Sequence, residues 1–172
     1  MRILTGNTAD LVPGLLNGSI DLGLLTAPVH NRQLRSRFFF RDTLVCIAPP
    51  AEASASRRVQ ARNLEGRQLV LYESGGSIRR SIDRWLARAD RRRMRVTDIG
   101  SADAQLAFVR AGFGWSIISE IAAREDAAAG RIELRPLDPP LYRDLVLVWR
   151  RDRAARPIIA AAMEAFFGRE KP

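Results

Sequence analysis

Short apolar runs alternate along the whole chain with stretches whose apolar residues recur at helical spacing. The runs are bounded by Gly, Pro or polar residues, which is typical of buried strands. Regular alternation of strands and helices favours an α/β fold with largely parallel sheets. The expected strands are 22–26, 38–40, 44–48, 69–72, 94–99, 115–118, 132–134 and 145–149.

The clearest helix follows Gly76. Its apolar residues recur at intervals of three and four and form one face, made of Ile78, Ile82, Trp85, Leu86 and Ala89. Ser77 is expected to cap the helix. The charged residues between the apolar ones are expected to face solvent, and these are Arg79, Arg80, Asp83 and Arg84.

Three other helices have weaker patterns. One opens near Ser101, stops at Gly112 and is expected to bury Ala102, Leu106 and Val109. One opens at Pro157, ends at Gly168 and is expected to bury Ile159, Met163, Phe166 and Phe167. The first runs from a cap at Thr8 to Gly18, and Pro13 inside it predicts a kink or a later start near Asp10. Residues 51–66 are expected to cross between lobes, with a short helix at 61–64.

Composition excludes several classes of protein. The 172 residues are 47% apolar and 27% charged, which allows a packed core. The net charge of +9 comes almost entirely from arginine, since Lys171 is the only lysine among 28 basic residues. These arginines are scattered and are not interleaved with aromatic residues, so we expect solvated faces rather than a nucleic-acid surface.

Cysteine and histidine are nearly absent. Cys46 is the only cysteine and lies in an apolar run, which predicts a core residue, and His30 is the only histidine. A disulfide within the chain is therefore excluded, and we expect no metal site, no cofactor and no catalytic Cys–His pair. No apolar run reaches the ~18 residues of a membrane span, and the first residues are too polar for a signal sequence. The protein is expected to be soluble and cytoplasmic.

Five segments in order resemble the effector-binding (substrate-binding) domain of LysR-type transcription regulators. The most specific is Val109-Arg110-Ala111-Gly112-Phe113-Gly114, which is similar to the family's V-x-A-G-x-G passage. The others are 5–8 together with 16–24, then 40–49, 75–80 and 144–153. Because the five are in register over nearly the whole chain, it is identified as a member of that family.

The resemblance implies two Rossmann-like lobes joined by two crossover strands, as in periplasmic binding proteins of the second type. Lobe one would comprise residues 1–47 and 144–172, and lobe two residues 48–143. Lobe one would lack its first strand and helix, since the chain begins at what resembles the second strand. The chain would thus be N-terminally truncated and would contain no DNA-binding domain.

The resemblance also implies a function. A small organic effector would bind in the cleft between lobes and bias the oligomer between arrangements on DNA. The intact regulator would self-associate as a dimer or tetramer. It would contact DNA only through a helix-turn-helix outside this chain, and no membrane partner is expected.

Ligands of α/β sheets bind where strands end and helices begin, because helix starts carry unpaired N–H groups and partial positive charge. Three junctions offer hydroxyls or glycine, at 5–8, 73–77 and 100–103, and Thr26 ends a strand. We expect them to hold a small organic acid, with Arg79 as a candidate countercharge. The predicted effector residues are Thr5, Gly6, Asn7, Thr8, Thr26, Ser74, Gly75, Gly76, Ser77, Arg79 and Asp103.

Other interpretations remain open at this point. Thr8, Ser77 and Ser101 are also ordinary helix caps, and Arg79 is also an ordinary solvated helix residue. Ser74 lacks the preceding glycine of a hydrolase G-x-S-x-G turn, and no Gly-x-Gly-x-x-Gly follows a strand, so no enzymatic activity is expected. The rival functions are a stand-alone solute-binding protein of the same fold and a truncated remnant.

Overall fold

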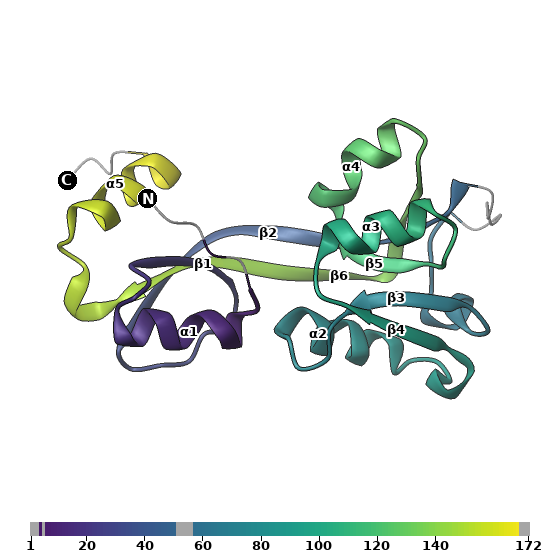
Figure 1. Ribbon diagram of the computed structural model, residues 1–172, viewed down its shortest axis with the longest axis horizontal. Helices are drawn as coiled ribbons and strands as arrows, with labels where there is room; N and C mark the ends of the chain where they lie inside the picture. Colours follow the sequence, from purple (N-terminus) through teal and green to yellow (C-terminus); the bar gives the residue numbers. More distant parts are fainter. Residues whose placement is uncertain (1–3, 5, 51–56, 169–172) are drawn as a thin grey trace. The chain divides into compact units, whose positions relative to one another are not determined.

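The computed structural model describes residues 4, 6–50 and 57–168 (Figure 1). The chain forms two compact units: unit 1 is Met1–Arg41 with Asp144–Pro172, and unit 2 is Asp42–Arg143. The strands β2 (Leu34–Ala48) and β6 (Glu133–Arg150) each contribute to both units. The first division falls after Arg41 rather than after residue 47, because the second half of β2 pairs with a strand of unit 2.

Unit 1 has a helix on each face of its strands. β1 (Leu22–Thr26) is antiparallel to β6, from Leu22 opposite Trp149 to Thr26 opposite Leu145. Alternate residues of a strand point to opposite faces. The face toward α1 (Thr8–Asn17) buries Leu15, Leu25, Leu34, Val146 and Val148. The face toward α5 (Pro157–Phe167) buries Leu147, Trp149 and Ile159.

Unit 2 combines a parallel and an antiparallel pair of strands. β3 (Gln68–Tyr72) is parallel to β4 (Arg95–Ile99), and β5 (Ser116–Ser119) is antiparallel to β2. Its helices are α2 (Ser77–Leu86), α3 (Ala102–Arg110) and α4 (Glu120–Ala128). The short 3-10 helices are η2 (Ala61–Leu64) and η3 (Arg91–Arg93) in unit 2 and η4 (Arg151–Arg153) in unit 1.

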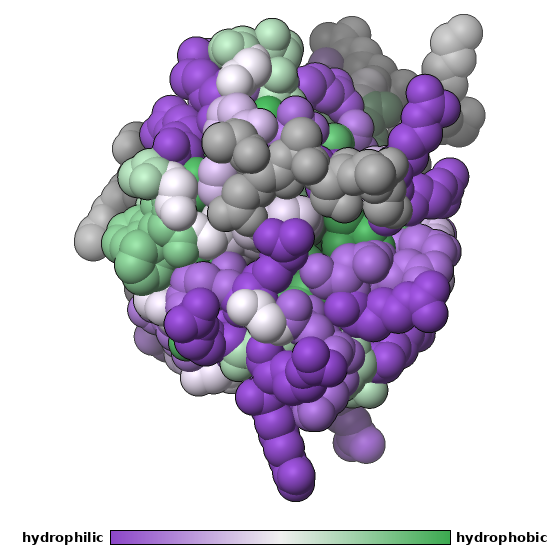
Figure 2. All heavy atoms as spheres, turned by 90° about the vertical axis from the view of Figure 1, so that its right-hand side faces the viewer, coloured by the Kyte–Doolittle hydropathy of each residue, from purple (hydrophilic) through white to green (hydrophobic). Residues whose placement is uncertain are grey.

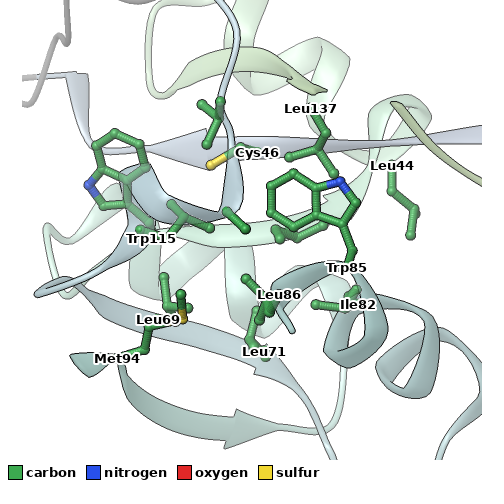
Figure 3. Packing of buried hydrophobic residues seen from close by; sticks show 14 of the residues in the cluster. Leu44, Cys46, Leu69, Leu71, Ile82, Trp85, Leu86, Met94, Trp115 and Leu137 are labelled. Atoms are coloured by element: carbon green, nitrogen blue, oxygen red, sulfur yellow. The ribbon is translucent and has the colours of Figure 1, made fainter. Parts of the chain in front are cut away.

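The main core of unit 2 surrounds Trp85 of α2, which is 2% exposed (Figure 3). Its indole N–H donates to the carbonyl of Pro139 at 2.7 Å, so the buried nitrogen is satisfied. The residues packed around it include Leu44, Leu71, Ile82, Leu86 and Leu137. Cys46 belongs to the same cluster, as predicted, and burial raises the pKa of its thiol to about 12. The apolar face predicted for the helix after Gly76 is therefore confirmed.

The predicted strands 22–26, 69–72, 94–99 and 115–118 are confirmed to within one residue, but the strand direction and the lengths of β2 and β6 were predicted wrongly. We expected largely parallel sheets, but β1–β6 and β2–β5 are antiparallel, and β3–β4 is the parallel pair. The pieces expected at 38–40 and 44–48 form one strand, β2, and those at 132–134 and 145–149 form β6. The larger sheet has the order β1–β6–β2–β5.

Several helix predictions also differ from the structure. α1 keeps Pro13 inside and begins at Thr8, with Asn7 rather than Thr8 as its N-cap. α2 begins at Ser77, with Gly76 as N-cap, so Ser77 is not the cap. Helix α4 was not predicted, since its alanine-rich sequence has no strong apolar face. Phe166 of α5 is 48% exposed and not buried.

Charged and polar side chains cover much of the face seen in Figure 2. Arg91, Arg92 and Arg93 of η3, for example, are all exposed, in agreement with the solvated faces expected for arginine. Among the described residues, no helix combines the length and apolar character that crossing a membrane requires.

Candidate functional site

The junction between β3 and α2 lies at the edge of unit 2 where two parallel strands end. Tyr72, the last residue of β3, stands opposite Ile99, the last residue of β4. Ser74 is exposed in the turn, and Gly75 has a φ of 91°, which favours glycine. Gly76 is the N-cap of α2 and has no side chain to accept a hydrogen bond from the first helical turn. The start of α2 therefore offers its N–H groups without a capping side chain.

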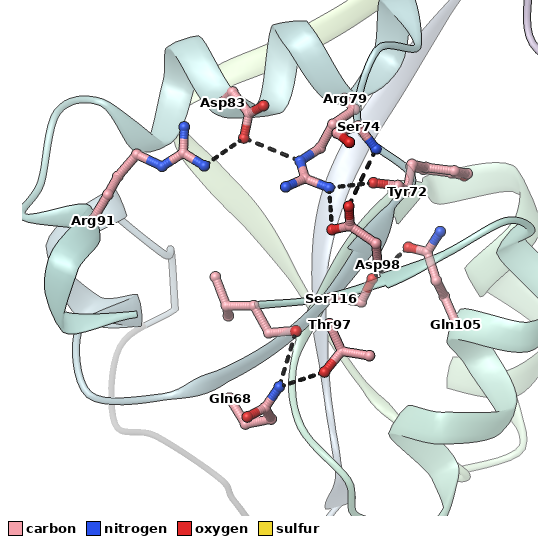
Figure 4. Close-up of polar contacts among 11 residues, drawn as sticks. Gln68, Tyr72, Ser74, Arg79, Asp83, Arg91, Thr97, Asp98, Gln105 and Ser116 are labelled. Carbon is pink, nitrogen blue, oxygen red and sulfur yellow. Dashed lines mark hydrogen bonds and ion pairs between the residues drawn. The ribbon is translucent and has the colours of Figure 1, made fainter. Parts of the chain in front are cut away.

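Arg79 lies inside unit 2 and not in solvent, which corrects the prediction for this helix face. Its Nη1 donates to Asp98 Oδ1 at 2.6 Å and to the Tyr72 carbonyl, and its Nε donates to Asp83 Oδ1 at 3.1 Å (Figure 4). The other oxygen of Asp98 accepts the backbone N–H of Ser74 at 3.3 Å. The hydrogen bond from Arg79 is the main reason that the pKa of Asp98 lies below its ordinary value.

The neighbouring junction between β4 and α3 carries the other polar groups of this edge. Ser101 caps α3, since its hydroxyl accepts the Ala104 N–H at 3.2 Å, as predicted. Asp103 is exposed in the first turn of α3. Burial raises the pKa of the Tyr72 hydroxyl, the positive charge of Arg143 opposes this, and the negative charges of Asp42 and Asp103 raise the pKa further.

A buried carboxylate that the sequence analysis missed lies in the same unit. Asp42 of β2 is 2% exposed, and it accepts hydrogen bonds from Ser119 Oγ at 3.0 Å and from Arg143 Nε at 2.7 Å. Asp98 was missed as well. Aspartate is uncommon inside strands, so Asp98 within the predicted strand 94–99 was a usable signal, whereas Asp42 fell between the predicted pieces 38–40 and 44–48.

In unit 1 the predicted residues lie at the start of α1 and at the end of β1. Asn7 caps α1, and its N–H donates to Asp10 Oδ2 at 3.3 Å. Thr26 is buried at the last position of β1. Because α1 and β1 run in opposite directions across a short turn, the end of β1 lies toward the start of α1 (Figure 1). Thr5 lies outside the described residues.

The structure thus forms two groups, one in each unit. Unit 2 brings together Ser74, Gly75, Gly76, Ser77 and Arg79, with Asp103 on the adjacent junction. Unit 1 places Gly6, Asn7 and Thr8 at one end of α1 and Thr26 at the end of β1.

Hollows within the individual units lie elsewhere. One of about 620 Å³ in unit 1 is lined chiefly by Arg35, Arg37, Arg151 and Trp149. One of about 290 Å³ in unit 2 is lined mainly by β2 and β6 residues such as Leu44, Leu134 and Tyr142. Neither includes a predicted effector residue. Among the described residues, no group of His, Cys, Asp and Glu side chains is arranged to hold a metal ion.

Comparison with known proteins gives the family. The family model described as the LysR substrate binding domain matches residues 1–169. The chain belongs to this LysR family. The HTH-type transcriptional regulator CbbR of Sinorhizobium medicae is 28% identical over 169 residues, which are 96% of this chain and 53% of that protein. An uncharacterized HTH-type transcriptional regulator of Mycobacterium bovis is 34% identical over 157 residues, 86% of this chain and 50% of that protein.

Solved LysR-type structures share the fold of this LysR substrate-binding domain. The CcmR regulatory domain of Synechocystis PCC6803, solved in complex with 2-PG, has a TM-score of 0.80 at 18% identity, covering 93% of this chain and 78% of that one. A full-length OxyR variant of Pseudomonas aeruginosa has a TM-score of 0.76 at 21% identity, covering 93% and 55%. The predicted α/β fold of the periplasmic-binding-protein type is confirmed. The chain spans about half the length of the curated relatives that it matches.

Proposed function

We propose that this LysR substrate-binding domain senses a small organic anion and that the junction between β3 and α2 binds its acid group. The observation that carries the proposal is the start of α2, where an exposed Ser74 precedes a helix whose N-cap, Gly76, has no capping side chain. Free N–H groups and the partial positive charge of a helix start stabilise anions. The hydroxyls of Ser74 and Ser77 supply additional donors.

The proposal includes the remaining predicted residues of both units. Gly75 allows the turn, and Asp103 is proposed to accept a donor group of the effector. In unit 1 the proposed contacts come from Thr5, Gly6, Asn7, Thr8 and Thr26. The CcmR regulatory domain was solved with 2-PG, which supports a small-molecule effector for a domain of this fold.

Effector binding is proposed to act on a longer regulator. The names of the relatives specify HTH-type transcriptional regulators, which supports DNA contact through a helix-turn-helix and self-association of the intact protein. An effector shifts such an assembly only by its differential affinity for two arrangements. The relatives are named as regulators, so the proposal contains no catalytic step, and it places the protein in the cytoplasm with its target DNA.

Calorimetric titration tests the effector assignment. Inorganic phosphate, succinate, benzoate and 2-PG are titrated into the wild type, Ser74→Ala and the matched control Ser81→Ala, which removes a hydroxyl further along α2. We expect at least one probe to bind, and Ser74→Ala to weaken it about fivefold, the effect of one lost hydrogen bond. Equal affinities for wild type and Ser74→Ala would remove Ser74 from the site, and binding of no probe would contradict a small-anion effector.

A further inference from the structure

We propose that Arg79 is a positioning residue of the effector site: it holds the turn that carries Ser74 in one geometry by binding Asp98 and the Tyr72 carbonyl. The inference rests on the proposed function, because it assigns a task to a residue within that same site. It also gives Arg79 a different task from a direct countercharge.

The Arg79 side chain is buried, so it is out of reach of a ligand bound on the outer side of the turn that carries Ser74. Its side chain is only 7% exposed, although it occupies the first turns of a surface helix. Nε and Nη1 already donate to two carboxylates and a carbonyl. The charge is balanced locally, since Asp83 accepts from Arg79 and also pairs with Arg91 at 2.9 Å. A second anion would therefore gain little from this guanidinium.

The same contacts fix the turn from two sides. The Tyr72 carbonyl, held by Arg79, immediately precedes Glu73 and Ser74. On the other side, Asp98 of β4 bridges Arg79 and the Ser74 N–H with its two oxygens (Figure 4). Arg79, Asp98 and Ser74 therefore form one chain of hydrogen bonds from the inside of unit 2 to its exposed edge.

This chain of hydrogen bonds reaches both the backbone and the side chain of Ser74. The Ser74 N–H donates to Asp98, and the Ser74 hydroxyl hydrogen-bonds to the same carboxylate, so Asp98 orients both donors of Ser74. A site gains affinity when its groups are already in the bound geometry, because less ordering accompanies binding. Ion pairs with a solvent-exposed partner add little net stability, and the Asp98 side chain is 41% exposed, so fixing one geometry is the more informative role to test.

The test compares Arg79→Met, Asp98→Asn and the control Arg84→Met. Methionine keeps the apolar stem of Arg79 without the donors. Asparagine replaces one of the two carboxylate oxygens with an NH2 donor, so it cannot accept on both sides as Asp98 does. It serves if Arg79→Met fails to fold. Arg84 is exposed on the same helix and touches Ser81 Oγ at 3.2 Å.

Two measurements are made on each variant. The first is the backbone amide resonance of Ser74 during a pH titration by NMR. In the wild type we expect it to follow Asp98 with a midpoint below the ordinary aspartate value, because Arg79 lowers the pKa of Asp98. We expect the midpoint to rise in Arg79→Met and the transition to vanish in Asp98→Asn. The second is the calorimetric affinity for 2-PG and inorganic phosphate, which we expect to fall about tenfold in both variants and to stay unchanged in Arg84→Met.

An unchanged Ser74 amide and unchanged affinity in both variants would overturn the inference, whatever happens to the melting temperature. If affinity is lost in Ser74→Ala but not in Arg79→Met or Asp98→Asn, the effector site stands and positioning by Arg79 fails. If no probe binds the wild type, the small-anion assignment fails, and the Ser74 amide alone decides whether Arg79 positions the turn.

Discussion

Two ion pairs join neighbouring positions of β2 and β6. In the first the arginine lies on β2 and the aspartate on β6, and in the second the aspartate lies on β2 and the arginine on β6. Arg41 pairs with Asp144 at 2.7 Å, with side chains 61% and 35% exposed. Asp42 pairs with Arg143 at 2.7 Å, with side chains 1% and 18% exposed. Because desolvation governs the cost of breaking an ion pair, the two pairs are expected to differ sharply in their effect on stability.

Asp42→Ala is expected to lower the free energy of unfolding by about 3–5 kcal/mol, because it leaves Arg143 largely buried without its carboxylate. Asp144→Ala removes the solvent-exposed equivalent and is expected to have a much smaller effect. Urea unfolding of the two variants measures the difference. Similar losses of unfolding free energy in both variants would show that burial does not determine the cost of breaking the ion pair.

Asp98 makes stability depend on pH in one direction. The pKa of Asp98 in the folded state lies below the ordinary value. Its contribution to the free energy of unfolding is therefore fully present above the ordinary pKa and is lost as the pH falls through the folded-state pKa. The melting temperature of the wild type should exceed that of Asp98→Asn by a constant margin from about pH 7 to pH 5, and the margin should shrink below about pH 4. A margin that widens on acidification would contradict this sign.

At the scale of elements, local signals identified helices and turns better than strand lengths. Ser101 was predicted as a cap and is one, whereas α1 and α2 begin one residue earlier than their predicted caps Thr8 and Ser77 imply. β2 and β6 were each divided into two pieces, since their sequences contain charged residues or prolines that usually end a strand. Arg79 was placed in solvent by helical spacing, which cannot reveal that Asp98 of another element lies opposite it.

The passage from α3 into β5 depends on Gly114. A Cβ at this position would lie 2.5 Å from the Gln68 carbonyl oxygen, which accepts the Trp115 N–H and joins β5 to β3. Gly114→Ala is expected to cost about 1–3 kcal/mol of stability through overpacking. Gly23→Ala is the control, since a Cβ there would meet its neighbours at ordinary contact distances of 3.4 Å or more. Equal melting temperatures for the two variants would count against the steric account.

For the whole molecule, the order of five segments was enough to predict the family and the fold class. The pairing of strands was not predictable in this way, because β1 and β6, or β2 and β5, are far apart in the sequence. The junction residues could be named from strand ends and helix starts, but the partners of the carboxylates beside them could not. Asp42 and Asp98 reach their partners only through tertiary contacts.

Ligand binding should also stabilise the folded chain. An effector at about 100 times its Kd adds about 2.7 kcal/mol to the free energy of unfolding. We expect the probe that binds the wild type to raise its melting temperature and to raise that of Ser74→Ala less at the same concentration. A thermal shift that is identical for the two proteins would place the ligand away from Ser74.

The most direct test of the effector site is a map of backbone amide shifts on titration with 2-PG and inorganic phosphate. We predict that the largest changes fall on residues 74–79 of unit 2, with further changes at 6–8 and at Thr26 of unit 1. Changes confined to the arginine-lined hollow around Arg35, Arg37 and Arg151, with none at the start of α2, would contradict the account.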